Sequence, residues 1–272
     1  MSPEYFRAKT DFGSFTVKIT GKTLISLGAE KQCVQIQYNS NNESELLWLG
    51  TKEGGCEVSG KDISGSDTQN MIYLATTIFR ERFPDATEIH LIDSSSLDCE
   101  LPRRVSPMSM MKTSLLLHGQ TYYQKKLGAY PRYKKDIENI EEFIKNRKDP
   151  SYKPLEFNFN NPELNEELQP IYTSSTTWEE FFIKLKDKYQ YDLLCKLMYP
   201  WYLQAFGKIA KGAITADWSV RIDDKPLIQY VKEMRGGSGR KTRNQYKNIT
   251  NSHRSDNWIG QNVYFISYKG II

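Results

Sequence analysis

The first fifty residues carry the hydrophobic pattern of a β-sheet. Apolar and polar side chains alternate over much of residues 13–38, which is the period of strands that bury one face. The apolar positions of this alternation are Phe15, Val17, Ile19, Val34, Ile36 and Tyr38. Gly21 and the polar run 39–42 have the composition of turns. Residues 46–49 are continuously apolar, as in a strand covered on both faces. We therefore expect a meander of three or four strands.

An α/β unit is predicted after this meander. Residues 50–67 are rich in glycine, and apolar side chains then recur at spacings of three and four up to Pro84, which is typical of an amphipathic helix. The pattern predicts, in order, a helix over 68–83, a strand over 88–93, a Ser-rich turn over 93–99 and a helix over about 108–127 that closes at Gly128.

The second half of the chain predicts mainly helices. Residues 132–170 are polar and contain four prolines, which favours a connector with a short charged helix at its start. We place a domain boundary near residue 150, which divides the chain into residues 1–150 and 151–272. Further helices are predicted over 134–147, 176–189, 192–209 and 225–235, a flexible linker over 235–240 and a strand over 263–268. The fold class is α+β, with a mixed sheet followed by a mainly helical half.

Composition narrows the class of protein. The 272 residues contain 37 Lys and Arg against 33 Asp and Glu, a balance too even to indicate nucleic acid by itself. No apolar run approaches the ~20 residues of a membrane helix, and the start of the chain lacks the apolar core of a signal peptide. The four cysteines lack metal-site spacing, and the three histidines lie far apart, so we expect free thiols, no metal site and a cytoplasmic protein.

The turn before the helix at 68–83 is a candidate phosphate site. The first amides of a helix have no partner within the helix, and the helix dipole places partial positive charge there. Glycines upstream let a backbone approach a pyrophosphate closely. The candidate binding residues are Gly65, Ser66, Asp67, Thr68 and Gln69. A plain helix start needs the same capping and turn residues, so this alternative stays open.

The order of these elements resembles the GNAT family of N-acetyltransferases. The strand at 46–49, the turn at 60–68 and the elements up to Gly128 correspond to that family's central strand, coenzyme A turn, helix, strand and last helix. The segment Tyr122-Tyr123-Gln124-Lys125-Lys126-Leu127-Gly128-Ala129 is similar to the motif at which that last helix ends. The resemblance covers about residues 13–130.

The resemblance implies an acyl-CoA-binding protein that transfers an acetyl group from acetyl-CoA to a small-molecule or protein amine, or a catalytically decayed relative. Such a reaction needs a general base for the amine and a general acid for the leaving thiolate. By position, Tyr122 or Tyr123 would be the acid, and Glu53, Glu57 or His90 would act as base through water. Paired tyrosines on a helix and a lone histidine in a strand are also ordinary packing residues.

A second resemblance is to an uncharacterised protein family of large cytoplasmic DNA viruses of eukaryotes. It spans most of residues 30–205. It rests on Phe83-Pro84, on the segment from Ile92 to Cys99, on Gly119-Gln120-Thr121-Tyr122-Tyr123 with Gly128-Ala129, and on the segment from Thr176 to Phe182. It implies a viral setting, in the host cytoplasm or the virion, and brings no established activity. The alternative function is thus that of a non-enzymatic, virion- or genome-associated protein.

Three further features have a functional and a structural interpretation. Asp93, Ser94, Asp98 and Cys99, with His118, suggest a nucleophile, although a turn bonded by its own side chains explains them as well. The aromatic stripe over 178–206 fits the core of a helical bundle better than a ligand site. Residues 232–254 hold seven basic residues against one acidic residue, which suits a nucleic-acid-binding segment or a solvated loop. The candidate contacts to nucleic acid are Arg235, Arg240, Lys241, Arg243 and Lys247.

Overall fold

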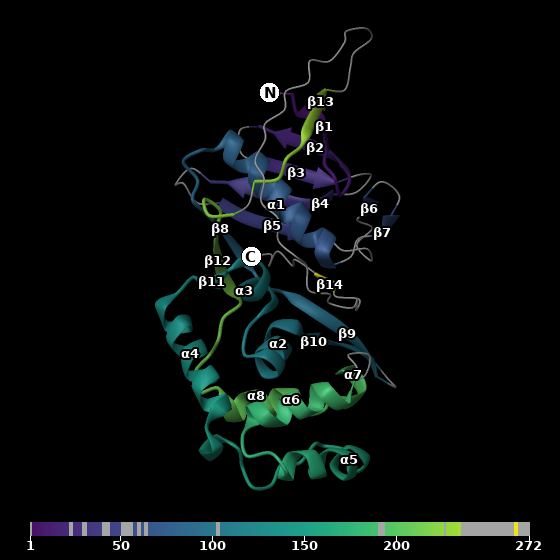
Figure 1. Ribbon diagram of the computed structural model, residues 1–272, viewed down its shortest axis with the longest axis vertical. Helices are drawn as coiled ribbons and strands as arrows, with labels where there is room; N and C mark the ends of the chain where they lie inside the picture. The colour runs from purple at the N-terminus through teal and green to yellow at the C-terminus, as the bar shows by residue number, and fades with distance from the viewer. Residues whose placement is uncertain are drawn as a thin grey trace. The chain divides into compact units, whose positions relative to one another are not determined.

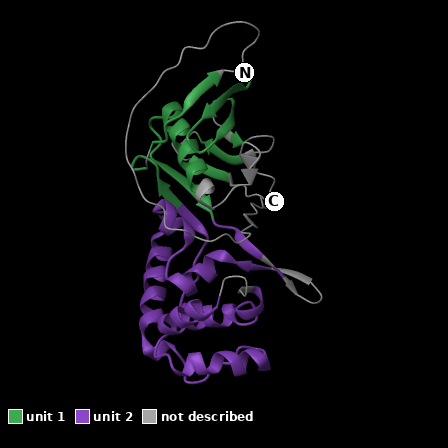
Figure 2. Cartoon of the chain, turned by 45° about the vertical axis from the view of Figure 1, so that its right-hand side comes forward, with its two compact units in different colours: residues 1–92, 219–272 green, residues 93–218 purple. Residues whose placement is uncertain are grey.

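The computed structural model confirms the α+β class and divides the chain into two compact units (Figures 1 and 2). Unit 1 comprises residues 1–92 and 219–272, and unit 2 comprises residues 93–218. The residues that the structure describes are 2–21, 24–28, 32–39, 44–49, 57–58, 61–62, 65–101, 104–189, 194–225, 227–234 and 264–265. Each unit is described by itself below.

Unit 1 is built on an antiparallel meander. Neighbouring strands of the meander pair in chain order, and Val17 of the second strand lies opposite Leu27 of the third. The five strands are β1 (Glu4–Lys9), β2 (Ser14–Thr20), β3 (Leu24–Gly28), β4 (Gln32–Tyr38) and β5 (Ser44–Leu49). The expected alternation is present, because Phe15, Val17 and Ile19 are buried in β2 between more exposed polar neighbours.

A helical crossover extends this sheet in the parallel direction. Helix α1 (Gly65–Arg82) connects β5 to β8 (Glu88–Ile92), which runs parallel to β5 with His90 opposite Glu45. The short strands β6 (Glu57–Val58) and β7 (Lys61–Asp62) pair with each other on the way to the helix. Strand β12 (Asp217–Arg221) follows β8 in the sheet order, and the boundary between the units falls within it.

Helix α1 covers β3 and β4 with its apolar face. The buried side chains of this face are Met71, Ile72, Leu74, Ala75, Ile78 and Phe79. At its end, Phe83 stacks on Tyr38 of β4 with ring centroids 4.6 Å apart. The spacing of three and four that predicted this helix is therefore the spacing that buries it against the sheet.

The helix expected over 225–235 is wrong, because part of this segment is a strand. Strand β13 (Val231–Met234) pairs antiparallel with β1, with Met234 opposite Phe6. Just before it, the ring of Tyr230 stacks on Phe6 at 6.4 Å, and its hydroxyl donates to Glu81 at 2.6 Å. The open edge of β1 supplies backbone partners that helical periodicity does not reveal.

Unit 2 is mainly helical. It opens with the hairpin of β9 (Ser95–Leu101) and β10 (Arg104–Ser109), so the Ser-rich turn expected over 93–99 is largely a strand. The elements that follow are α2 (Met110–His118), α3 (Tyr122–Leu127), β11 (Tyr130–Pro131), α4 (Lys134–Lys148), the 3-10 turn η1 (Pro150–Tyr152), α5 (Pro162–Thr173), α6 (Trp178–Lys188), α7 (Leu194–Leu197) and α8 (Tyr202–Ile209). In unit 1, β14 (Tyr264–Phe265) is the last described element.

The helix expected over 108–127 is divided at Gly119. Gly119 has a left-handed φ of 70° and closes α2, and Thr121 then starts α3 with a capping box to Gln124. Likewise, the helix expected over 192–209 appears as α7 and α8, with Pro200 in the turn between them.

An aromatic core holds unit 2 together and includes the Pro-rich segment. The rings that pack there are Phe157, Phe159, Tyr172, Trp178, Phe181, Phe182 and Trp201. Trp178 Nε1 donates to the carbonyl of Tyr152 at 2.9 Å, and the Tyr172 hydroxyl donates to that of Pro154 at 2.6 Å. The boundary expected near residue 150 thus falls inside unit 2, because aromatic contacts bind this segment to the helices. The interpretation of the 178–206 stripe as core is confirmed.

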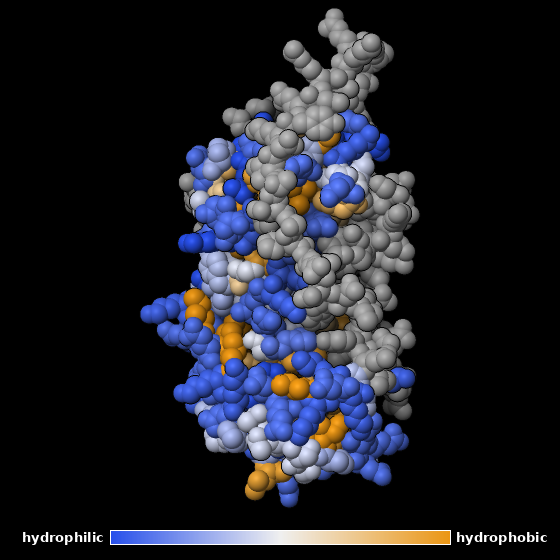
Figure 3. Space-filling view, viewed as in Figure 1, coloured by the Kyte–Doolittle hydropathy of each residue, from blue (hydrophilic) through white to orange (hydrophobic). Residues whose placement is uncertain are grey.

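Exposed apolar side chains of unit 2 are distributed over several elements. The large ones are Tyr133, Ile137, Leu155, Ile183 and Leu203. On the described part of the face in Figure 3, apolar residues form separate patches among hydrophilic ones. Scattered apolar residues of this kind are ordinary on a protein surface.

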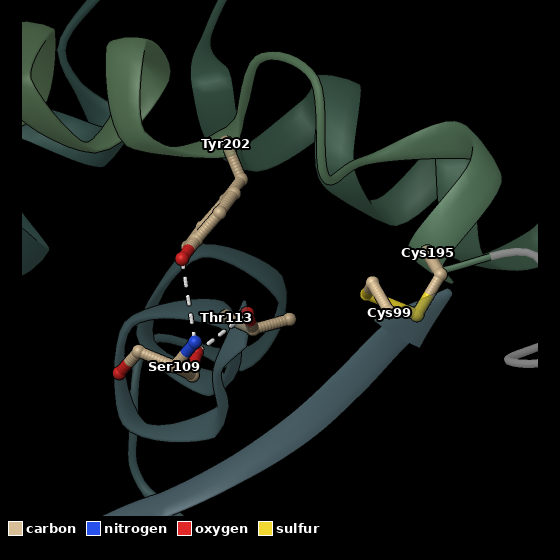
Figure 4. The surroundings of a disulfide bond; sticks show 5 residues. All are labelled: Cys99, Ser109, Thr113, Cys195 and Tyr202. Atoms are coloured by element: carbon tan, nitrogen blue, oxygen red, sulfur yellow. Dashed lines mark hydrogen bonds between the residues drawn. A yellow bond between two sulfur atoms is a disulfide. The ribbon is translucent and has the colours of Figure 1, made fainter. Parts of the chain in front are cut away.

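A disulfide bond joins Cys99 of β9 to Cys195 of α7 (Figure 4). Nearby, Tyr202 accepts the amide of Ser109 at 3.3 Å, and the Thr113 hydroxyl donates to the Ser109 carbonyl at 2.7 Å. Cys33 is disulfide-bonded as well. The expectation of free thiols is therefore wrong for these residues, since spacing along the sequence does not show which cysteines meet in space. The argument for a reducing compartment loses this support.

We expect loss of the Cys99–Cys195 bond to destabilise unit 2. The bond spans 96 residues of chain, and native disulfides of this kind contribute about 2–4 kcal/mol. The double variant Cys99→Ser/Cys195→Ser should unfold at lower denaturant than the parent chain. Non-reducing peptide mapping by mass spectrometry should recover the linked pair from the parent chain, and recovery of both cysteines as thiols would contradict the assignment.

Gly119→Ala tests the break between α2 and α3. Alanine at a left-handed φ costs about 1–2 kcal/mol, and its Cβ would lie 3.3 Å from Arg147 Nη1. Gly21→Ala is the matched control, because Gly21 has a φ of 63° and no atom within 4 Å of the added Cβ. Denaturant unfolding should show a larger loss for Gly119→Ala than for Gly21→Ala; equal losses would show that Arg147 does not crowd the site.

Candidate functional site

The first turn of α1 consists of the residues expected to hold phosphate. Gly65, Ser66, Asp67 and Thr68 open the helix, and only their backbone is described. The side chain of Gln69 is engaged along the helix, because its Nε2 donates to the Tyr73 hydroxyl at 2.8 Å. Since α1 is 18 residues long, its opening turn has the full dipole of a long helix behind it.

A β-bulge lies in the strand that leads toward this helix. Gln35 of β4 pairs with Trp48 and the next residue, Ile36, pairs with Leu46, so that Leu47 is an extra residue in β5. A bulge interrupts the ladder and occurs frequently beside active sites. In a strand–helix–parallel strand unit, the start of the helix and the carboxyl ends of both strands share one sheet edge. The bulge and the opening turn of α1 therefore belong to the same edge of unit 1.

His90, a candidate base, lies in β8 of the same unit. Its Nδ1 lies 2.8 Å from the hydroxyl of Ser219 in β12, and the ring is half-buried. The hydrogen bond fixes the orientation of the imidazole. The other two candidate bases are not described to this level: Glu53 lies outside the described residues, and only the backbone of Glu57 is described.

The paired tyrosines lie in α3 of unit 2. Their rings meet edge to face at 5.7 Å. Tyr123 is buried, and burial together with the nearby charge of Asp93 raises its pKa well above the ordinary value, so its phenol stays protonated. A side chain with 4% exposure packs the unit and does not face a substrate. Of the two, Tyr122, which is half-buried, is the better candidate acid.

The tyrosines belong to unit 2, and the α1 turn and His90 belong to unit 1.

Asp93 is a buried carboxyl group directly after β8. Its Oδ1 accepts the amide of Ser95 at 3.1 Å and the Ser95 hydroxyl, and its own amide donates to the carbonyl of Ala216 at 2.7 Å. Burial raises the pKa of Asp93 to about 6, against the effect of the two hydrogen bonds from Ser95. The sequence singled out this residue, but not its burial.

The structure does not support a cysteine nucleophile. Cys99 is buried and its sulfur is in the disulfide with Cys195, so it carries no thiol. Ser94 is exposed, and for Asp98 only the backbone is described. The positive charges of Lys186, Lys125 and Arg147 act on His118, the base that this hypothesis needs.

A group of basic residues surrounds His118, where four helices of unit 2 end. The residues are His118 in the last turn of α2, Lys125 in that of α3, Arg147 in that of α4 and Lys186 in that of α6. Burial and the charges of these three neighbours lower the pKa of His118 to about 4. We call these four residues the basic cluster. Sequence analysis missed it, although basic residues in the last turns of successive helices were its signal.

Arg147 is the buried centre of the basic cluster. Its guanidinium, 3% exposed, donates from Nε to the Leu116 carbonyl at 2.8 Å and from Nη2 to that of Leu117 at 3.3 Å. Nη1 forms an ion pair with Glu179 of α6 at 2.7 Å. Arg147 thus binds the last carbonyls of α2 and joins α4 to α6.

The remaining sequence candidates are not described. Arg235, Arg240, Lys241, Arg243 and Lys247 lie outside the described residues, so nucleic-acid binding by the basic segment stays a prediction. Within the described part of the chain, no group of three or more metal-ligating side chains is found. In that same part, no helix is long and apolar enough to span a membrane.

The pKa shifts of His118 and Asp93 predict opposite pH effects on stability. His118 binds its proton more weakly when folded, so its contribution to stability, up to about 3 kcal/mol, is present above pH 6.5 and lost as pH falls toward 4. Asp93 binds its proton more tightly when folded, so its contribution is present below pH 3.8 and lost as pH rises through about 6.

These effects can be separated by substitution. As the pH falls from 7 to 4, the free energy of unfolding of His118→Gln should rise relative to that of the parent chain. Over the same range, that of Asp93→Asn should fall relative to the parent chain. Urea unfolding across this pH range measures both differences, and each variant serves as the control for the other. A variant curve that stays parallel to that of the parent chain would contradict the assigned pKa shift.

Comparison of the chain with protein-family models, with curated proteins and with solved structures gives no match. The function is therefore inferred from the geometry of the two units and from the residues themselves.

Proposed function

We propose that unit 1 binds the pyrophosphate of an acyl-coenzyme A at the opening turn of α1, as the GNAT resemblance suggests. The observation that carries this proposal is the crossover from β5 through α1 to the parallel strand β8, with a bulge at Leu47. The antiparallel meander in front of the crossover and the glycine-rich segment before the helix support the same assignment.

The physical basis is backbone recognition of a charged ligand. The amides of the first turn of a helix donate to phosphate oxygens, and the dipole adds an attraction of about 0.3–1 kcal/mol at an exposed site. The bulge frees backbone groups of β5 from the ladder, and these can bond an amide-containing arm of the ligand. Together they suit a long ligand with phosphates at one end and a thioester at the other.

The proposed reaction is acyl transfer to an amine. The amine nitrogen attacks the thioester carbonyl carbon, the bond from carbon to sulfur breaks, and an amide and a thiol form. The amine loses one proton to a base, and the thiolate gains one from an acid. Within unit 1, His90, oriented by Ser219, is the candidate base. A chain that binds the coenzyme but does not turn over would be a decayed relative.

Asp67 limits the affinity in this proposal. It is the third residue of α1, where GNAT members carry no acid in the turn that holds the pyrophosphate. A carboxylate in the turn that binds two phosphates would repel them. We therefore expect weak binding by the natural chain.

Asp67→Asn should strengthen coenzyme A binding by about 3–10-fold, because removal of one negative charge from the first turn of the helix is worth about 1 kcal/mol. Isothermal titration calorimetry with coenzyme A at millimolar concentration and low salt measures the change. Asp85→Asn is the matched control, since Asp85 is exposed and lies beyond the other end of α1. No heat with any of the three proteins, or equal affinities of the two variants, would contradict the proposal.

The alternative, a non-enzymatic viral protein that binds nucleic acid, rests on the composition of residues 232–254. No described contact favours it over acyl-CoA binding, and it stays a prediction.

A further inference from the structure

The two faces of the meander in unit 1 differ in character. Residues directly opposite each other in an antiparallel pair share a face, and successive residues of a strand alternate between faces. The row of opposed residues across the first four strands is buried: Phe6, Val17, Leu27 and Val34. Val34 shares its face with Tyr38, on which Phe83, directly after α1, stacks at 4.6 Å. Helix α1 therefore covers this face.

The opposite face of β1 and β2 carries polar and charged side chains and one aromatic ring. Its residues, in register, are Tyr5 with Lys18, Arg7 with Thr16, and Lys9 with Ser14. We call these six residues the outer face. The side chains of Tyr5, Arg7, Lys9 and Lys18 are exposed, and the exposed fraction of Tyr5 is 39%. The outer face thus presents three cations and an aromatic ring to solvent.

Only one of the three cations is neutralised within the described fold. Lys9 forms an ion pair with Glu233 of β13 at 2.7 Å. Arg7 and Lys18 form no ion pair with a described residue. Lys18 Nζ instead lies 5.8 Å from the centroid of the Tyr5 ring, within the range of a cation–π interaction. Two positive charges of this face are therefore available to a ligand.

The ring of Tyr5 lies between these two charges. Arg7 is two residues away on the same strand, which is a distance of about 7 Å, and Lys18 is directly across from the ring on β2. Exposed polar residues alone are ordinary on the solvated face of an antiparallel sheet. An exposed ring with a cation on each side is what points to a ligand that is both flat and anionic.

We propose that the outer face binds single-stranded nucleic acid, with one base stacked on Tyr5 and backbone phosphates at Arg7 and Lys18. Stacking on an aromatic side chain beside a positively charged surface is the usual way in which such strands are held. The Thr16 hydroxyl, opposite Arg7, can donate to a phosphate or sugar oxygen. An acidic peptide would use the cations but has no flat base for the ring.

The sequence after β13 adds to the charge complementarity. Glu233 of β13 lies opposite Arg7, so β13 borders the outer face. The strand ends at Met234, and residues 235–254 then contain six Lys and Arg and no Asp or Glu. Since α1 packs on the other face of the sheet, the outer face is distinct from the turn proposed to bind coenzyme A, and neither proposal needs the other.

The first test is fluorescence anisotropy of a labelled 20-nucleotide oligothymidylate with the full chain between 50 and 200 mM salt. Arg7→Gln should weaken binding by about threefold or more, and it should lower the slope of log affinity against log salt by about 0.7, the contribution of one phosphate contact. Arg82→Gln is the matched control, because Arg82 is an exposed arginine in the last turn of α1. Equal effects of the two substitutions, or no binding by the parent chain, would overturn the proposal.

The second test separates stacking from charge. Tyr5→Phe keeps the ring and should keep the affinity, whereas Tyr5→Leu should lose about fivefold or more, since each stacked base contributes at least that factor. Both variants retain a large apolar side chain on the strand, so a difference in affinity reports the ring and not the fold. Equal affinity of the two variants would refute base stacking on Tyr5.

Two further outcomes would assign the binding elsewhere and overturn the proposal. Binding that is lost when the basic residues of 235–254 are replaced by Gln, but is unchanged in Arg7→Gln and Tyr5→Leu, would show that the basic segment acts alone. Equal affinity for a 20-residue polyglutamate peptide, insensitive to Tyr5→Leu, would show a surface for an acidic protein.

Discussion

The buried guanidinium of Arg147 is the interaction on which the helical unit depends. It satisfies the end of α2, joins α4 to α6 through Glu179, and limits the space beside Gly119. Removal of Glu179 would leave the buried guanidinium without its acidic partner. A single side chain thus couples three helices, and its charge also sets the electrostatic conditions for the groups around it. Burial lowers the pKa of both His118 and Lys186, and the charge of Arg147 lowers both further.

Unit 1 depends on a different constraint, the change of strand direction at β5. Up to β5 the strands pair antiparallel in chain order, and after it the chain crosses through α1 to reach the parallel strand β8. This change places a helix start beside the ends of two strands, where a chain has backbone donors to offer. The opening turn of α1 therefore offers backbone groups in unit 1, whereas the basic cluster of unit 2 consists of charged side chains.

The periodicity of apolar residues predicted the helices whose buried face is formed by residues close together in the sequence. Helix α1 was expected over 68–83 and α6 over 176–189, because their apolar spacing matches the face that they bury. Features decided by distant residues were missed: the pairing of β13 with β1, the Cys99–Cys195 bond, and the packing of the Pro-rich segment onto Trp178 and Tyr172. The same holds for the sites. The α1 turn was visible in the sequence, whereas the basic cluster consists of residues from four helices that only the tertiary fold brings together.

The first strand of the chain, β1, pairs with β13, which follows unit 2 in the sequence. Unit 2 is thus an insertion in the chain of unit 1. During synthesis on the ribosome, the meander emerges well before the strand that completes its edge, because all of unit 2, residues 93–218, is made before β13. Until then β1 presents unpaired backbone groups, which invite pairing with other chains. Unit 2 can therefore fold during synthesis while the sheet of unit 1 still lacks its edge strand β13.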